Sequence, residues 1–203
     1  MTPGAIVTDI EGTTSSLAFV HEVLFPYSRA RLADFVATHA ERVASILAEV
    51  RTEAGKPTLS ADDCIALLLK WHDEDRKIGP LKTLQGLIWE QGFAAGALKG
   101  HVYADAVAGL RRWHKHNIPL YIYSSGSVAA QKLLFGHSDF GDLTQLFSGY
   151  FDTGIGGKKE AESYRAIARK LALPTADILS TPSWSPPRKL VCALFCWHVQ
   201  TCH

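Results

Sequence analysis

Two short apolar runs, each ending in polar residues, are the clearest pattern along the chain. The first covers residues 5–8 and ends at Asp9, and the second covers residues 118–123 and ends at Ser124. Short β-branched runs that break into a glycine turn are typical of buried strands. Elsewhere apolar residues recur near the helical period, which predicts helices over residues 28–54, 60–75, 80–95, 104–116 and 159–172, and another beginning near Val128.

Residues that favour helix ends support several of these predictions. Ser60 is a candidate N-cap, with Asp62 and Asp63 in the first turn of the helix that follows. Pro80 suits the first position of the next helix, because its missing N–H would have no partner there. These signals indicate helices that begin near residues 60 and 80.

The order of the elements predicts an α/β fold. A strand, a long helical insert, a strand, a helix, a strand and a helix indicate a Rossmann-like parallel sheet core with right-handed crossovers. The insert is too long for one crossover helix, so we expect a helical cap inserted after the first strand, over the strand ends where such sheets bind ligands. Residues 1–15 and 99–203 would form the α/β core, and residues 16–98 the cap.

Composition and charge narrow the class of protein. The 203 residues include 21 basic and 20 acidic side chains, for a formal net charge of +1. Nucleic-acid and membrane-surface binding need clustered Lys and Arg, so we expect neither partner. No apolar run approaches the roughly 20 residues that span a bilayer. Because the chain also begins without a secretory signal pattern, and the four cysteines do not form a spread disulfide framework, we expect a cytoplasmic protein.

The residues after the first strand can carry out acid–base and nucleophilic chemistry. Asp9 and Glu11 stand two positions apart, and Gly12 permits a tight turn beside them. One carboxylate could attack phosphorus while the other transfers protons, or the pair could hold a hard cation such as Mg²⁺. An Asx-type turn with a solvated Glu11 is the alternative that this segment leaves open.

Two later segments could bind phosphate. Ser124 and Ser125 precede Gly126 at a strand-to-helix junction, where free helix N–H groups attract anions. Lys158 follows a glycine-rich loop and could neutralise phosphate and a carboxylate nucleophile, although on charge alone Lys159 would serve equally well. The alternatives are an ordinary N-cap serine and a solvated lysine pair.

Taken in order, these motifs resemble those of the haloacid dehalogenase superfamily of phosphatases. Within it, Thr8-Asp9-Ile10-Glu11-Gly12-Thr13-Thr14 resembles the enolase-phosphatase family, which has Glu where most relatives have Asp. The resemblance covers roughly residues 5–179 and includes the inserted segment. It is carried by Asp73-Glu74-Asp75-Arg76-Lys77, Leu81–Trp89, Tyr121–Phe135, Phe151-Asp152-Thr153, Lys158 and Glu162-Ser163-Tyr164.

The resemblance implies a function and a role for each site residue. The family first enolises 2,3-diketo-5-methylthiopentyl-1-phosphate and then dephosphorylates it to the acireductone of methionine salvage. Asp9 would accept the phosphoryl group, and Glu11 would be the acid/base. Asp9 and the Glu11 backbone carbonyl would bind Mg²⁺, while Ser124, Ser125 and Lys158 would bind the substrate phosphate. The family register favours Lys158 over Lys159, and a monomer is expected from the family.

The sequence departs from this family after residue 179. The family has an apolar strand there that ends in Ser-Asp, and that Asp is a Mg²⁺ ligand. This chain instead has a stretch with prolines at 182, 186 and 187, and no Asp or Glu after Asp177. Since prolines do not fit a central strand, we expect the strand and one metal ligand to be missing. An altered reading frame over residues 180–199 would explain the departure.

Three further interpretations stay open. The chain could be a catalytically impaired relative that binds a phosphometabolite or a protein partner, because the acidic ligand is missing. It could also be a general small-molecule phosphatase of the same superfamily. Finally, Cys192, Cys196, His198 and Cys202 could form a metal cluster, although their spacing is not a standard zinc pattern.

Overall fold

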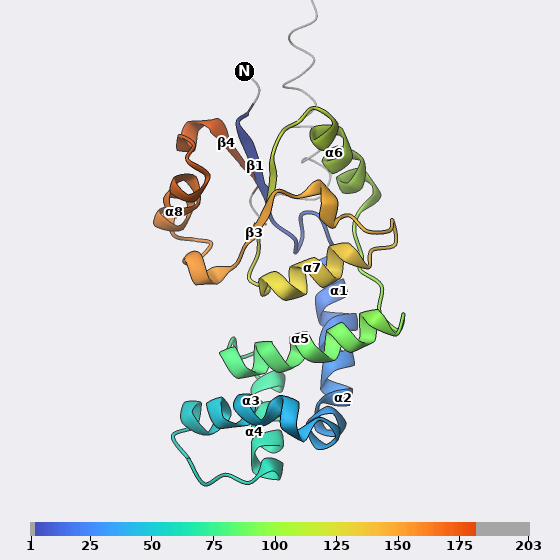
Figure 1. The fold of residues 1–203 in the computed structure, drawn as a ribbon, viewed down its shortest axis with the longest axis vertical. Coiled ribbons are helices and arrows are strands. Elements are labelled where there is room, and N and C mark those ends of the chain that lie inside the picture. Colours follow the sequence, from blue (N-terminus) through green and yellow to red (C-terminus); the bar gives the residue numbers. More distant parts are fainter. Residues whose placement is uncertain (1–2, 182–203) are drawn as a thin grey trace, which may run out of the picture. The chain divides into compact units, whose positions relative to one another are not determined.

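The computed structural model describes residues 3–181. These residues form two compact units, one made of residues 3–19 and 99–181 and the other of Val20–Leu98. The first unit is an α/β structure built on a parallel sheet, and the second is entirely helical. Figure 1 shows both, coloured along the chain.

The α/β unit contains a four-stranded parallel sheet with strand order β3-β2-β1-β4. The predicted α/β fold with a parallel sheet is therefore confirmed. The register pairs Ile6 with Leu120 and Thr8 with Thr181. The strands are β1 Ala5–Thr8, β2 Leu120–Tyr123, β3 Gly149–Phe151 and β4 Ile178–Thr181.

Helices cover both faces of this sheet. Val7 and Tyr123 pack with Ile167 of α8 on one face, while α6 packs against β2 and α7 against β3. Alternate strand residues face opposite sides, so the fully buried Ile6 and Ile122 face away from α8. The elements are α1 Leu17–Phe19, α6 Ala104–Lys115, α7 Val128–Gly136, α8 Ala161–Leu171 and the 3₁₀ turns η2 Thr144–Leu146, η3 Thr153–Ile155 and η4 Thr175–Asp177.

The strand predicted to be missing is present. β4 pairs with β1 over four residues and ends at Thr181, directly before Pro182. The prediction of a missing strand was wrong because the first proline of the stretch, Pro182, comes only after the strand has ended. Residues 178–181 contain no proline, so all of their N–H groups remain available to the ladder.

The two chain segments that lead out of and back into this unit contact each other. The Ser16 backbone N–H donates to His101 Nδ1 at 3.1 Å. The His101 ring lies between Phe19 and Tyr103, with centroid distances of 6.1 and 5.0 Å. Tyr103 N–H in turn donates to the Thr14 carbonyl at 2.9 Å. These contacts join residues 14–19 to residues 101–103.

The helical unit begins with a π-helical turn and has its own core. Ser60 forms the predicted N-cap of α4, since its hydroxyl accepts the Asp63 N–H and the Asp63 carboxylate accepts the Ser60 N–H. The helix predicted over residues 28–54 is two helices, because His39 leaves the helical region at φ −122° and ψ 41°. The elements are η1 Val20–Leu24, α2 Phe25–Thr38, α3 Ala40–Glu53, α4 Ala61–Asp73 and α5 Gly79–Ala94.

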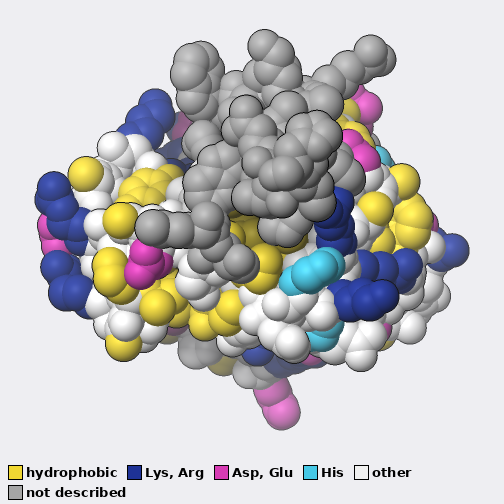
Figure 2. Space-filling view, turned by 90° about the horizontal axis from the view of Figure 1, so that it is seen from above, with side chains coloured by type: hydrophobic (Ala, Val, Ile, Leu, Met, Phe, Trp, Pro, Cys, Tyr) yellow, Lys and Arg dark blue, Asp and Glu magenta, His cyan; other side chains and the backbone are white. Residues whose placement is uncertain are grey.

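Charged side chains are distributed in small groups. On the face shown in Figure 2, Lys and Arg side chains lie in several separate groups, with Asp and Glu side chains beside some of them. On α8 the exposed Glu162 pairs with Arg165 and Arg169. Within residues 3–181, no helix is long and apolar enough to cross a membrane.

Candidate active site

The loop that follows β1 is a tight, internally bonded turn. The Ile10 carbonyl accepts the N–H groups of Thr13, Thr14 and Ser15 at 2.9–3.1 Å. Gly12 adopts φ 74°, a left-handed conformation that glycine adopts without a steric cost. The turn brings Asp9 to the carboxyl end of β1, where the residue is buried.

The Asp9 carboxylate has one bonded oxygen and one free oxygen. Its Oδ1 accepts the Ile10 N–H at 2.7 Å and forms an ion pair with Lys158 Nζ. Its Oδ2 is buried and has no hydrogen-bond partner within residues 3–181. Because a buried carboxylate oxygen is normally satisfied, Oδ2 is the atom at which a bound cation or substrate would complete the site.

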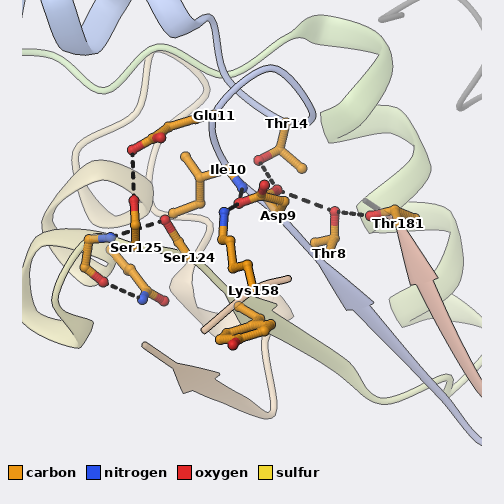
Figure 3. Close-up of polar contacts among 12 residues, drawn as sticks. Thr8, Asp9, Ile10, Glu11, Thr14, Ser124, Ser125, Lys158 and Thr181 are labelled. Carbon is orange, nitrogen blue, oxygen red and sulfur yellow. Dashed lines mark hydrogen bonds and ion pairs between the residues drawn. The ribbon is translucent and has the colours of Figure 1, made fainter. Parts of the chain in front are cut away.

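The backbone of Asp9 is held by hydroxyl groups. Its carbonyl accepts the Thr14 hydroxyl at 2.9 Å and the Thr8 hydroxyl at 3.3 Å. Thr8 in turn accepts the hydroxyl of Thr181, at the end of β4, at 2.8 Å. Figure 3 shows this row of hydroxyls beside the carboxylate. It ties the position of Asp9 to the end of β1 and to the neighbouring strand β4.

A glycine loop directs Lys158 toward Asp9. Gly156 adopts φ 135°, and a Cβ atom there would lie 2.2 Å from Ser163 Oγ. The Ser163 hydroxyl donates to the Gly157 carbonyl at 2.8 Å, and the Tyr123 hydroxyl donates to the Gly156 carbonyl at 2.7 Å. The loop is thereby fixed from α8 and from β2. It places Lys158 on Asp9, while the adjacent Lys159 is exposed.

Glu11 lies beside the second predicted motif. The Ser125 hydroxyl donates to Glu11 Oε1 at 3.5 Å, as Figure 3 shows. Ser124 is almost fully buried, and its hydroxyl accepts the Gly126 N–H at 3.3 Å. The structure therefore brings the predicted residues together as two contacting pairs, Asp9 with Lys158 and Glu11 with Ser125. Ser124 stands next to the second pair.

Several polar residues around the site were not predicted. Thr8 was expected only as a strand residue, and Thr181 lies in the stretch in which no strand was expected, so neither hydroxyl gave a functional signal in the sequence. Tyr164 was quoted in a motif but given no role. Burial, the nearby Tyr123 ring and the Asp9 carboxylate raise the pKa of its phenol, in that order of importance.

The oxygen donors here suit a hard cation, although the acidic residues are few. Asp9 Oδ2 and the Thr13 hydroxyl are both buried without a partner in the described part of the chain. Oxygen ligands of this kind are those that Mg²⁺ prefers. Among residues 3–181, however, no three His, Cys, Asp or Glu side chains cluster at metal-binding distance. The candidate cysteine–histidine cluster at 192–202 lies outside the described residues, as does the stretch after Thr181.

Comparison with known proteins agrees with this geometry. The family model of haloacid dehalogenase-like hydrolases matches residues 3–179. The enolase-phosphatase E1 of Parvibaculum lavamentivorans is 59% identical over 177 residues, which are 86% of this chain and 75% of that protein. The corresponding protein of Methylococcus capsulatus is also 59% identical over 177 residues, covering 86% of this chain and 78% of its own.

A solved structure supports the fold. The crystal structure of the UTR4 protein of Saccharomyces cerevisiae is 34% identical, with a TM-score of 0.75 over 88% of this chain and 80% of that chain. The matches in sequence and in structure extend through both the α/β unit and the helical unit. The chain is therefore a phosphatase of the haloacid dehalogenase-like hydrolases and belongs to their enolase-phosphatase family.

Proposed function

We propose that this chain is a bifunctional enolase-phosphatase that converts 2,3-diketo-5-methylthiopentyl-1-phosphate to the acireductone in methionine salvage. The observation that carries this proposal is the Asp9–Lys158 pair at the end of the central strand, with Glu11 and Ser125 beside it. The similarity to enolase-phosphatases supports the choice of substrate. We expect a monomer that acts in the cytoplasm on this small phosphorylated molecule.

Asp9 is the proposed nucleophile. Its side chain is 5% exposed, so few water molecules compete for it. The Ile10 N–H and Lys158 hold one oxygen and so fix the rotation of the side chain. A carboxylate oxygen of Asp9 attacks phosphorus as the bond from phosphorus to the substrate oxygen breaks, which leaves a phosphoryl group on Asp9.

Glu11 is the proposed general acid and base. As the first bond breaks, its carboxyl proton moves to the leaving oxygen of the substrate. Its carboxylate then takes a proton from water as the water oxygen attacks phosphorus, releasing inorganic phosphate and restoring Asp9. For the preceding enolisation a base must take a proton from carbon, and Glu11 is the simplest candidate because it already contacts the site.

Charge neutralisation holds the phosphoryl group during both transfers. Such transfers depend mainly on positioning and electrostatic stabilisation. The ammonium of Lys158 and the hydroxyls of Ser124 and Ser125 would bind phosphate oxygens. Asp9 and the backbone carbonyl of Glu11 would hold Mg²⁺, which when bound neutralises charge on the phosphoryl oxygens. The unpartnered Asp9 Oδ2 supports this assignment.

The experiment is phosphate release from the diketo phosphate by the purified chain, beside the Asp9→Asn variant and with formation of the acireductone followed by absorbance. The proposal predicts phosphate and acireductone from the wild type and neither from the variant. Equal phosphate release by both proteins would eliminate Asp9 as the nucleophile. Phosphate release from many esters with no preference for the diketo phosphate would favour a general phosphatase.

The lack of any Asp or Glu after Asp177 favours a second candidate, an impaired relative that binds a phosphorylated metabolite. Titration of the wild type with inorganic phosphate by calorimetry separates the two. Binding without turnover at any Mg²⁺ concentration would support the impaired relative. Turnover that saturates with Mg²⁺ supports the enolase-phosphatase.

A further inference from the structure

Gln131 is a buried amide beside the proposed phosphate site that the reaction above does not use. It lies in the first turns of α7 and is 1% exposed. Its Nε2 donates to the Gly126 carbonyl at 2.8 Å and to the Phe151 carbonyl at 2.9 Å. These two carbonyls belong to different segments, the loop after β2 and the end of β3. One side chain therefore joins the two segments.

The orientation of this amide follows from its neighbours. Both groups that the amide contacts are carbonyl oxygens, which can only accept hydrogen bonds. The NH₂ end must therefore face them, and it donates one hydrogen to each. The opposite atom, Oε1, is buried without a hydrogen-bond partner within residues 3–181. Leaving a buried acceptor unpaired costs free energy. The Gln131 amide is therefore oriented by the two carbonyls that it binds, at the cost of one unpaired acceptor.

The two carbonyls control the loop that carries the serines. The Phe151 carbonyl also accepts the Ser124 N–H at 3.2 Å, so Gln131 and Ser124 share one acceptor. Gly126 closes the loop by donating its N–H to Ser124 Oγ at 3.3 Å. Because the peptide unit is planar, fixing the Gly126 carbonyl toward Gln131 turns the next N–H, that of Ser127, the opposite way. Gln131 therefore fixes the peptide plane after Gly126, and it binds the same carbonyl that accepts the Ser124 N–H.

We propose that Gln131 is a positioning residue that holds the Ser124–Gly126 loop in the conformation that binds the phosphate of the substrate. This inference rests on the proposed function, in which Ser124 and Ser125 bind phosphate oxygens. Gln131 itself does not touch the substrate. It acts through the backbone, by fixing the loop from behind against the end of β3.

The test compares Gln131→Met with Phe135→Leu. Methionine keeps the length and apolar volume of the side chain but removes both donors. Phe135 lies on the same helix, is fully buried and packs on Phe147 at a centroid distance of 4.6 Å, so its truncation weakens the core without touching the loop. Two quantities are measured: amide hydrogen exchange at Ser124, and the inhibition constant of inorganic phosphate.

In Gln131→Met we expect Ser124 exchange to accelerate about 10-fold and the phosphate inhibition constant to rise about 10-fold. A change of this size corresponds to the loss of roughly one to two hydrogen bonds. In Phe135→Leu both should stay within about 2-fold of the wild type, even at a similar loss of melting temperature. A shared response in the two variants would show a merely structural role and overturn the proposal, as would wild-type values in Gln131→Met.

The exchange measurement also separates this proposal from the function on which it rests. If Ser124 exchange is faster in Gln131→Met but the wild type binds no phosphate, the serines do not bind phosphate, and the proposal fails with the function on which it rests. Slow exchange together with normal phosphate binding in the wild type and in Gln131→Met would refute only the role of Gln131.

Discussion

Replacing Lys158 by Met should disable catalysis and destabilise the α/β unit. Methionine retains most of the aliphatic stem but removes the ammonium that pairs with Asp9 Oδ1. The Asp9 side chain is only 5% exposed, so its charge would then have the Ile10 N–H but no cation among the contacts that the structure shows. The variant therefore leaves a buried carboxylate poorly compensated.

The size of the effect follows from the burial of the two partners. Breaking a fully buried pair costs about 3–5 kcal/mol, but the Lys158 side chain is 22% exposed, so water screens part of the interaction. We expect the free energy of unfolding to fall by about 1–3 kcal/mol. Catalysis should lose more, because removing one preorganised group that stabilises transition-state charge lowers kcat about 10²–10³-fold.

Lys159→Met is the matched control, since it removes the same charge one residue away on an exposed side chain. We expect its kcat to stay within about 2-fold of the wild type and its stability within about 0.5 kcal/mol. The assay is steady-state phosphate release, with urea unfolding for stability. Equal losses in the two variants would refute the reasoning, because general charge and not contact with Asp9 would then be responsible.

A double-mutant cycle with Asp9→Asn isolates the pair. If the two side chains interact directly, the combined variant should lose less stability than the sum of the single losses. Additive losses would contradict the direct contact.

Three other predictions test separate parts of the account. Glu11→Gln should lower kcat for the diketo phosphate about 10²–10⁴-fold. With 4-nitrophenyl phosphate, whose leaving group needs no proton, the variant should still transfer the phosphoryl group to Asp9 and give a burst of nitrophenolate, because only the second step lacks its base. A loss of activity without a burst would count against Glu11 as the base in the second step. Gly156→Ala forces φ 135° on alanine and a methyl against Ser163, so unfolding free energy should fall by about 1–3 kcal/mol and kcat should fall with it. Gly136→Ala, whose methyl meets Thr144 at an ordinary 3.5 Å, should change neither kcat nor the fold. Burial lowers the pKa of His72 below its usual value of 6.5, so the unfolded chain binds the proton more readily and stability should fall as pH drops from 7.5 through 6.5. In His72→Gln, thermal unfolding across this pH range should no longer show that contribution. An unchanged slope of stability against pH would show that other groups cause it.

The sequence predicted best what depends on local chemistry. Asp9 follows a strand whose four residues are all buried, and that burial pattern is readable from the apolar run alone. Ser60 caps α4 as expected because a serine followed three residues later by an acid satisfies both free N–H groups at a helix start. Parallel strands also bring their carboxyl ends to one edge of the sheet. Because Asp9 follows β1 and Lys158 lies in the loop after β3, the two residues are expected at the same edge.

Features that depend on tertiary contacts could not be predicted in this way. No glycine or proline marks the break between α2 and α3 at His39. The contact that accompanies the break, the stacking of the His39 ring on Phe35, exists only in the folded unit. β4 forms because β1 supplies a partner for every one of its residues, despite the prolines that follow. Gln131 appears in sequence as a polar residue in a helix, and only the structure shows that its amide reaches two carbonyls from different segments.

The most direct test of the account is to identify the residue that carries the phosphoryl group. The enzyme is mixed with the diketo phosphate, quenched in acid within the first turnover and treated with borohydride, which reduces an aspartyl phosphate to homoserine. Peptide mass spectrometry then locates the change. The account predicts homoserine at position 9 in the wild type and an unmodified peptide in Asp9→Asn. Turnover with Asp9 unmodified, or a modified carboxylate at any other position, would contradict it.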